Sequence, residues 1–146
     1  MITYKNRFET ILGMLYVLRS LNQTIHWNFI GFNFIDFHKY LDEVLEVIDS
    51  YVDEVAEDIR KNDMFVQQPL SLIPTILNDY EISVEPVDDM DLLIINYFEI
   101  INLLIAYCTE TIEITDSETS KDVIIRLNQE LEKIRWFLKS TFNILN

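Results

Sequence analysis

The chain has 146 residues, of which 49% are hydrophobic, only two are glycine and three are proline, and its formal net charge is −14. This size and apolar content suit one folded domain, residues 1–146, and exclude a disordered chain. So few turn residues disfavour a sheet protein and favour long helices. The charge disfavours binding to nucleic acid, because phosphates would be repelled, and favours a cation as ligand. Solubility alone is the simpler explanation of the charge.

Two long helices are predicted in the first half of the chain. Apolar residues at three- and four-residue spacing predict a helix from Tyr4 to Ile30 that ends at Gly31. The same spacing predicts a second helix from Phe34 to Lys61, with Asn33 as its N-cap. The stripe of this second helix that faces the core is expected to consist of Leu41, Leu45, Ile48, Val52, Ala56 and Ile59.

The second half begins with a long connection, 62–88, which holds all three prolines and a short helical piece at 75–80. A third helix is predicted from Met90 to Ile114 and a fourth from Glu118 to Leu145, with Ser117 as its cap. A connection of this length usually crosses a bundle. The sequence therefore predicts an all-α protein, a four-helix bundle of two hairpins joined by a long crossover that contains a short helix.

Targeting and cysteine signals are sparse. Cys108 is the only cysteine, which excludes an intrachain disulfide and a cysteine-based metal cluster. The N-terminus lacks the pattern of a signal peptide, and the most apolar stretch, 92–108, is interrupted by three polar residues. We therefore expect a cytoplasmic protein that does not enter a membrane.

The only two histidines, His26 and His38, are accompanied by carboxylates on the second helix. Asp42 follows His38 by four residues, and Glu57 follows Asp53 by the same step. At about 100° per residue, positions 38, 42, 53 and 57 form one polar stripe beside the core face. Mixed imidazole and carboxylate ligands suit Fe(II), Mn(II) or Zn(II). The alternative is a solvated acidic face with two structural histidines.

The spacing of this stripe points to two chains. Asp42 and Asp53 lie roughly 16 Å apart along the helix, too far to hold one metal ion. However, the pair 38 and 57 and the pair 42 and 53 share the same midpoint, between positions 47 and 48. An antiparallel two-fold pairing would place Asp42 opposite the partner's Asp53 and His38 opposite the partner's Glu57. Two shared sites would form, and His26 could complete each one.

The same residues carry a family resemblance. His26-Trp27-Asn28 is followed by Gly31, Asn33-Phe34, His38, Asp42-Glu43, Asp53-Glu54 and Ala56-Glu57. This segment resembles the signature of the Dps-family mini-ferritins, and Leu131-Glu132-Lys133, Trp136 and Leu138 resemble the last helix of that family. The resemblance implies a ferritin-like four-helix bundle and a dodecameric hollow shell built from two-fold dimers.

The resemblance also implies an activity and its residues. His26, His38 and Asp42 of one subunit, with Asp53 and Glu57 of its two-fold mate, would be both metal ligands and catalytic residues of a ferroxidase site. Family members oxidise Fe(II), often with hydrogen peroxide in preference to oxygen, and store the ferric mineral. The expected function is thus iron oxidation, iron storage and protection against oxidative stress.

Further residues are candidates by position. Acidic residues near a three-fold pore guide Fe(II) inward in the family, and Asp116, Glu118 and Asp122 are candidates here. Trp27, next to His26, is a candidate electron donor that would quench stray oxidising equivalents.

Two features depart from the family. Its lysine-rich terminal tail is replaced by little more than Lys5 and Arg7, so no DNA binding is expected at physiological salt. The glycines that usually follow the second helix are also absent, and residues 62–65 stand there instead. Two alternatives remain: a shell with weak ferroxidase activity that buffers zinc or manganese, and a metal-free acidic helical module that binds a basic partner.

Overall fold

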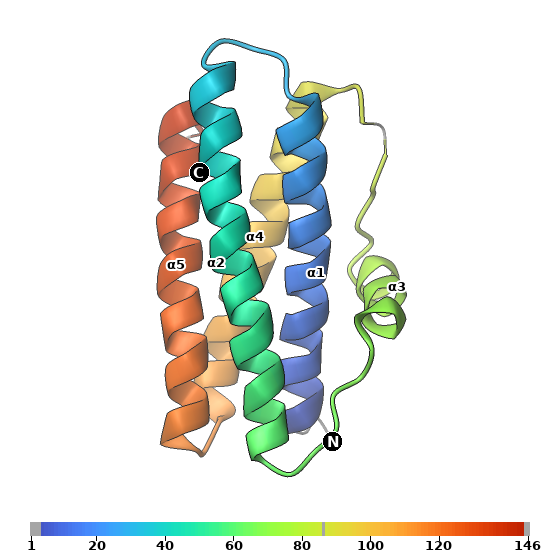
Figure 1. Ribbon diagram of the computed structural model, residues 1–146, viewed down its shortest axis with the longest axis vertical. Coiled ribbons are helices and arrows are strands. Elements are labelled where there is room, and N and C mark those ends of the chain that lie inside the picture. The colour runs from blue at the N-terminus through green and yellow to red at the C-terminus, as the bar shows by residue number, and fades with distance from the viewer. Residues whose placement is uncertain (1–3, 86, 145–146) are drawn as a thin grey trace.

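The computed structural model describes residues 4–85 and 87–144, which form a bundle of four long helices with one short helix at its side (Figure 1). The helices are α1 (Tyr4–Asn28), α2 (Phe34–Lys61), α3 (Pro69–Asp79), α4 (Met90–Ile114) and α5 (Glu118–Phe142). α1 and α2 form one antiparallel hairpin, and α4 and α5 form the other. The segment between α2 and α4 returns along the outer side of α1 and carries α3. The predicted all-α bundle with a long crossover is confirmed.

The hydrophobic core lies between the four long helices. The largest side chains that are fully buried are Tyr97, Phe8, Ile11, Leu12, Met14, Leu15, Leu18, Ile25, Leu41, Ile48, Ile59 and Ile101. Each buried aliphatic or aromatic side chain contributes about 1.5–3 kcal/mol to stability before its loss of entropy is counted. α4 is long and apolar enough to cross a membrane by length and composition, but half of its most apolar window is buried inside the bundle. Central helices of bundles have this composition.

The core face of α2 differs from the predicted stripe. Leu41, Ile48, Val52 and Ile59 are buried as expected, but Leu45 and Ala56 are only half-buried. Their places in the core are taken by Phe37, Val44 and Val55. The buried face is therefore rotated away from the carboxylates, because α2 packs against both α1 and α5 rather than against α1 alone. Leu45 and Ala56 are left as a half-exposed apolar edge between the core and the acidic residues.

The turn between α1 and α2 corrects two details of the prediction. α1 ends at Asn28 rather than Ile30, although the Phe29 amide still donates to the Ile25 carbonyl at 2.9 Å. Asn33 is in the left-handed conformation, with φ 66°, and its side chain makes no capping hydrogen bond. Asparagine tolerates this conformation better than most residues, so Asn33 closes the turn through its backbone instead of capping α2.

Other helix ends follow the sequence more closely. The Ser117 hydroxyl accepts a hydrogen bond from the Ser120 amide, which confirms Ser117 as the cap of α5. α5 ends at Phe142, and the predicted end at Leu145 lies outside the described residues.

The short helix of the crossover is longer than predicted. α3 begins at Pro69, where a residue without an amide hydrogen fits the first turn, and it tolerates Pro74 in its interior. It packs closely on α1 at Gly13, because a Cβ added there would lie 2.8 Å from Cγ1 of Ile76. The glycine thus lets the crossover lie directly on the bundle.

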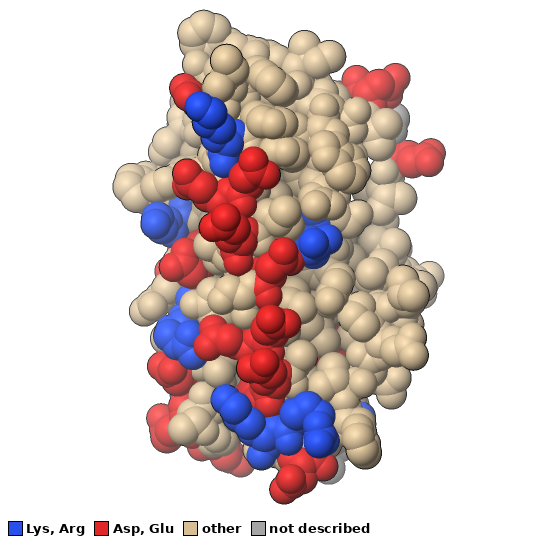
Figure 2. All heavy atoms as spheres, viewed as in Figure 1, with Lys and Arg blue, Asp and Glu red and all other residues tan. Residues whose placement is uncertain are grey.

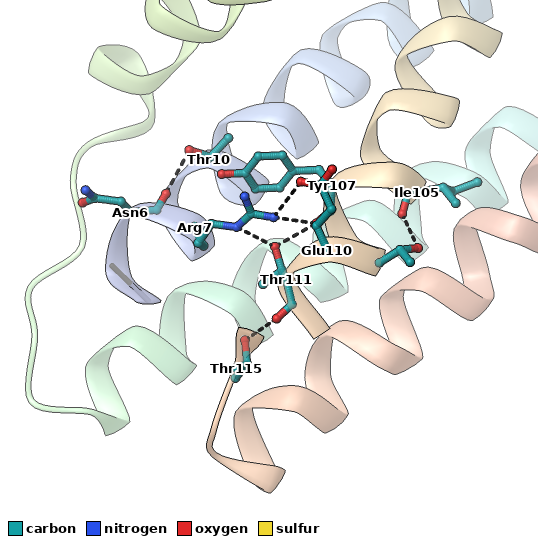
Figure 3. Close-up of polar contacts among 9 residues, drawn as sticks. Asn6, Arg7, Thr10, Ile105, Tyr107, Glu110, Thr111 and Thr115 are labelled. Atoms are coloured by element: carbon teal, nitrogen blue, oxygen red, sulfur yellow. Dashed lines mark hydrogen bonds and ion pairs between the residues drawn. The ribbon is translucent and has the colours of Figure 1, made fainter. Parts of the chain in front are cut away.

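A buried arginine joins the two hairpins near the start of α1 (Figure 3). The guanidinium of Arg7 lies 3.8 Å from the ring centre of Tyr107 on α4. Its Nε donates to the Thr111 hydroxyl at 3.0 Å, and Nη2 donates to the Tyr107 carbonyl at 3.1 Å. Nη2 also lies 3.5 Å from the carboxylate of Glu110. Cys108, one turn before Thr111, is buried as predicted, and burial raises the pKa of its thiol to about 12.

Candidate metal centre

The two histidines meet at the end of the first hairpin. His26 lies in the last turn of α1 and His38 in the second turn of α2, and the antiparallel arrangement brings them side by side. Their rings are stacked, with centroids 3.7 Å apart and planes inclined by 16°. The fold therefore places two potential nitrogen ligands next to each other.

Each ring is held by the backbone of the other histidine. His26 Nδ1 lies 3.0 Å from the His38 carbonyl oxygen, and His38 Nδ1 lies 2.8 Å from the His26 carbonyl oxygen. A carbonyl oxygen can only accept, so each Nδ1 carries the proton and donates it. The lone pair of each neutral ring is therefore on Nε2. Histidines that bind metals commonly have their second ring nitrogen anchored in this way.

Asp42, the third candidate ligand of this region, lies beside His26. Its Oδ1 lies 3.5 Å from His26 Nε2. The side chain of His26 is 16% exposed and that of Asp42 is 62% exposed, so the pair lies at the surface and is open to an ion from solution. The fold thus places His26, one of the five residues predicted from the sequence, beside two of the others, His38 and Asp42.

The other two residues, Asp53 and Glu57, are exposed on α2 and lie further along the helix. Eleven residues separate Asp42 from Asp53, roughly 16 Å along the axis. Within 4–85 and 87–144, no group of three or more His, Cys, Asp or Glu side chains is arranged to hold a metal ion. The predicted ligands therefore lie in two separate places within one subunit: His26, His38 and Asp42 near the α1–α2 turn, and Asp53 and Glu57 further along α2.

Acidic side chains extend along α2 between these two places, and Figure 2 shows them gathered in a column. Two arginines form ion pairs with acidic residues of α2. Arg19 Nε lies 2.7 Å from Oδ1 of Asp49. Arg126 Nη1 contacts both carboxylate oxygens of Glu54, at 3.1 and 3.0 Å. The predicted ligands Asp42, Asp53 and Glu57 are not among these arginine pairs.

The candidate pore acids lie around the start of α5. Asp116 is exposed in the connection from α4. Glu118 lies 3.4 Å from Lys121, and Asp122 lies 3.0 Å from Arg126. Trp27, the candidate electron donor, is 68% exposed beside His26. Two of the three candidate acids are therefore already paired with cations in the subunit.

The sequence interpretation missed a buried polar pair beneath the centre. Asn22 is 1% exposed and its Nδ2 donates to the Leu41 carbonyl at 2.9 Å. Its Oδ1 accepts from the hydroxyl of Tyr97, on α4, at 2.5 Å. Asn22 precedes His26 by one helical turn, and Leu41 immediately precedes Asp42. A signal for this pair was present in the sequence: Asn22 lies on the apolar stripe of the first helix, one turn before the candidate ligand His26.

Comparison with known proteins identifies the family of the chain. The model of the ferritin-like domain matches residues 6–146. The DNA protection during starvation protein of Mycolicibacterium smegmatis is 31% identical over 121 residues, which cover 80% of this chain and 64% of that protein, just under two thirds of its length. The protein of the same name from Agrobacterium fabrum is 26% identical over 145 residues, covering 92% of this chain and 89% of that one.

A solved structure supports the same assignment. The tetragonal form of Mycobacterium smegmatis Dps has a TM-score of 0.84 and 26% identity, and the match covers 94% of this chain and 84% of that one. The family match, the two relatives and the common fold lead to one conclusion: the chain belongs to the ferritin-like family and, within it, to the Dps mini-ferritins.

Proposed function

We propose that this protein oxidises Fe(II) at sites shared between two subunits and stores the ferric product inside a closed, dodecameric shell. The family supports iron storage as the general role. The observation that carries the ferroxidase proposal is the stacked pair of histidines, each anchored through Nδ1 by a backbone carbonyl, with Asp42 3.5 Å from Nε2 of His26. Nitrogen and carboxylate ligands together suit Fe(II).

In this proposal two subunits complete each site. His26, His38 and Asp42 come from one subunit, and the partner's Asp53 and the partner's Glu57 supply the remaining carboxylates. The half-buried apolar edge of Leu45 and Ala56, beside the acidic column, offers packing surface for a second copy. The carboxylates that would meet across such a pairing carry like charges, which bound Fe(II) would neutralise.

The reaction would transfer one electron from each of two Fe(II) ions to a single peroxide molecule. Two Fe(II), one H₂O₂ and two protons give two Fe(III) and two water molecules, so the O–O bond breaks without release of a hydroxyl radical. Oxygen is the alternative oxidant. The carboxylates would stabilise the growing positive charge on iron, and the neutral imidazoles would remain ligands because their protons are held on Nδ1. Zinc or manganese could occupy the same ligands.

Accessory roles remain part of the proposal. Asp116 is the one candidate pore acid without an ion pair among the described residues, and it would attract Fe(II) more strongly than Glu118 or Asp122. Trp27 would donate an electron only if its exposed ring faces the site in the assembled shell.

We also propose that protection by this chain does not involve DNA. Both cations at the start of α1 are already engaged in the subunit. Lys5 lies 3.9 Å from the carboxylate of Glu9, and Arg7 is buried against Tyr107. With a net charge of −14, little attraction for phosphates remains. A gel shift at physiological salt should leave duplex DNA free, and tight binding there would contradict this.

The decisive experiment compares Glu57→Ala with Glu46→Ala. Both residues are exposed carboxylates of α2 and lose the same charge, but only Glu57 belongs to the proposed ligand set. We expect Fe(II) oxidation with stoichiometric peroxide, followed by ferric absorbance, to slow by about tenfold to a hundredfold in Glu57→Ala. Glu46→Ala should stay close to the wild-type rate.

The opposite result would change the proposal. Equal and slow oxidation in wild type and both variants would contradict the ferroxidase role and favour a shell that buffers zinc or manganese. Particle size tests the assembly separately, because a dodecamer is far heavier than a single chain of 17.4 kDa.

A further inference from the structure

Beneath the candidate metal centre, two buried residues that are not ligands join three helices. We infer that Asn22 and Tyr97 are positioning residues for the metal centre: they fix the axial register of α1 and α2, so that His26 meets His38 and Asp42. This inference rests on the proposed function for its metal readout, but the register it describes can be measured without metal.

The first argument is the pattern of hydrogen bonds across the hairpin. Asn22 Nδ2 donates to the carbonyl of Leu41, and one turn further on His26 Nδ1 donates to the carbonyl of His38. His38 Nδ1 returns a bond to the carbonyl of His26. These three bonds form a ladder between antiparallel helices. The bond from Asn22 is the most deeply buried of the three, and the two histidine bonds lie nearer to the surface.

The second argument is geometric. Apart from the exposed Arg19–Asp49 pair and the bond from Tyr4 to Asp58 at the far end of the hairpin, apolar side chains make up the rest of the α1–α2 contact. Their packing tolerates small shifts better than a directional hydrogen bond does. A helix rises 1.5 Å per residue, whereas metal–ligand distances must be met within about 0.2 Å. A displacement of even part of one residue would therefore separate His26 from Asp42. A buried amide that must reach one particular carbonyl opposes such a displacement.

The third argument concerns the orientation of Asn22. The Leu41 carbonyl can only accept, so Nδ2 must face it and Oδ1 must face Tyr97. Tyr97 is fully buried, and burial raises the pKa of its phenol well above the usual value, so it remains a donor. The hydroxyl of Tyr97, which lies on α4, therefore holds the Asn22 amide in one orientation. The register of the first hairpin is thereby tied to the second.

The test uses the double variant Asn22→Leu/Tyr97→Phe. It removes both partners of the buried bond and leaves the Leu41 carbonyl with its own helical hydrogen bond, so the fold should persist. The matched control is Asn128→Leu, which removes a buried amide that bonds to Thr109 between α4 and α5, away from the centre. Thermal unfolding should be cooperative in both variants.

Two readouts follow, the first without metal. Imidazole nitrogen-15 chemical shifts of neutral His26 and His38 should show the Nδ1–H tautomer in wild type and control, and a mixture of tautomers in the double variant. In Co(II) titrations followed by visible absorption, the dissociation constant should rise about tenfold or more in the double variant only. A merely structural role would alter the melting temperature without moving either readout.

The outcomes separate the two proposals. Wild-type tautomers and wild-type Co(II) affinity in a folded double variant would overturn the positioning role. If wild-type protein binds no Co(II), the proposed function fails, and the tautomer readout alone then decides whether Asn22 and Tyr97 set the register.

Discussion

The two hairpins of the bundle differ in the hydrogen bonds that join the two helices of each hairpin. Between α1 and α2, the amide of Asn22 and both histidine rings have hydrogen-bond partners on the facing helix or on α4. Between α4 and α5, the corresponding buried amide is less well placed. Among the described residues, Oδ1 of Asn128 is the one buried side-chain nitrogen or oxygen atom without a hydrogen-bond partner. The Nδ2 of Asn128 donates to the Thr109 hydroxyl at 3.3 Å.

The two hairpins therefore differ in how exactly their side chains must be placed. The α4–α5 hairpin contributes mainly apolar surface, and burial of such surface is not directional. The α1–α2 hairpin carries the candidate ligands, and its polar bonds fix one arrangement among several that apolar packing would allow. Core substitutions should therefore lower stability in either hairpin, whereas substitutions that weaken metal binding should be confined to α1–α2.

The largest expected effect is on stability, from Leu104→Ala in α4. Leu104 is fully buried, so its truncation should lower the free energy of unfolding by about 2–5 kcal/mol through lost burial and a cavity. Chemical denaturation measures this change. Ile95→Ala is the control on the same helix, because Ile95 is 50% exposed and should change stability by about 0.5 kcal/mol or less. Similar losses in both would contradict the assigned core face of α4.

A smaller effect in energy, but a specific one, is expected from Asp42→Asn. The amide cannot neutralise a cation as the carboxylate does, so Co(II) should bind about tenfold more weakly, or about 1.4 kcal/mol. Calorimetric titration gives the dissociation constant, and thermal unfolding without metal should be nearly unchanged because Asp42 is exposed. Glu43→Gln, an exposed neighbour on the same helix, is the charge control. Equal weakening in both would indicate general attraction by the acidic column rather than ligation.

The smallest expected effect has the opposite sign. Asn128→Leu removes the unpaired carbonyl oxygen, and the Thr109 hydroxyl keeps its bond to the Ile105 carbonyl at 2.8 Å. We expect the free energy of unfolding to rise by up to about 1 kcal/mol. A thermal melt compared with wild type checks this, and a clear loss of stability would mean that the amide has a partner in the assembled protein.

The helices, the long crossover and the candidate ligands could all be predicted from the amino-acid sequence. Helical periodicity and the spacing of His26, His38 and Asp42 are local properties, so they can be read along the chain. The sequence-based prediction was wrong where the outcome depends on more than local spacing. The left-handed backbone of Asn33 and the rotated core face of α2 both result from contacts with elements distant in sequence or from turn geometry.

How the candidate ligands are oriented depends on packing between helices, which the sequence did not reveal. The stacking of the two imidazoles, the bonds from each Nδ1 to the facing backbone, and the buried bond from Tyr97 to Asn22 all depend on atoms brought together by packing of α1, α2 and α4. Helical spacing fixes which residues share a face, but not the axial register between helices. That register is set by side chains that interlock across an interface, and it decides whether the candidate ligands meet.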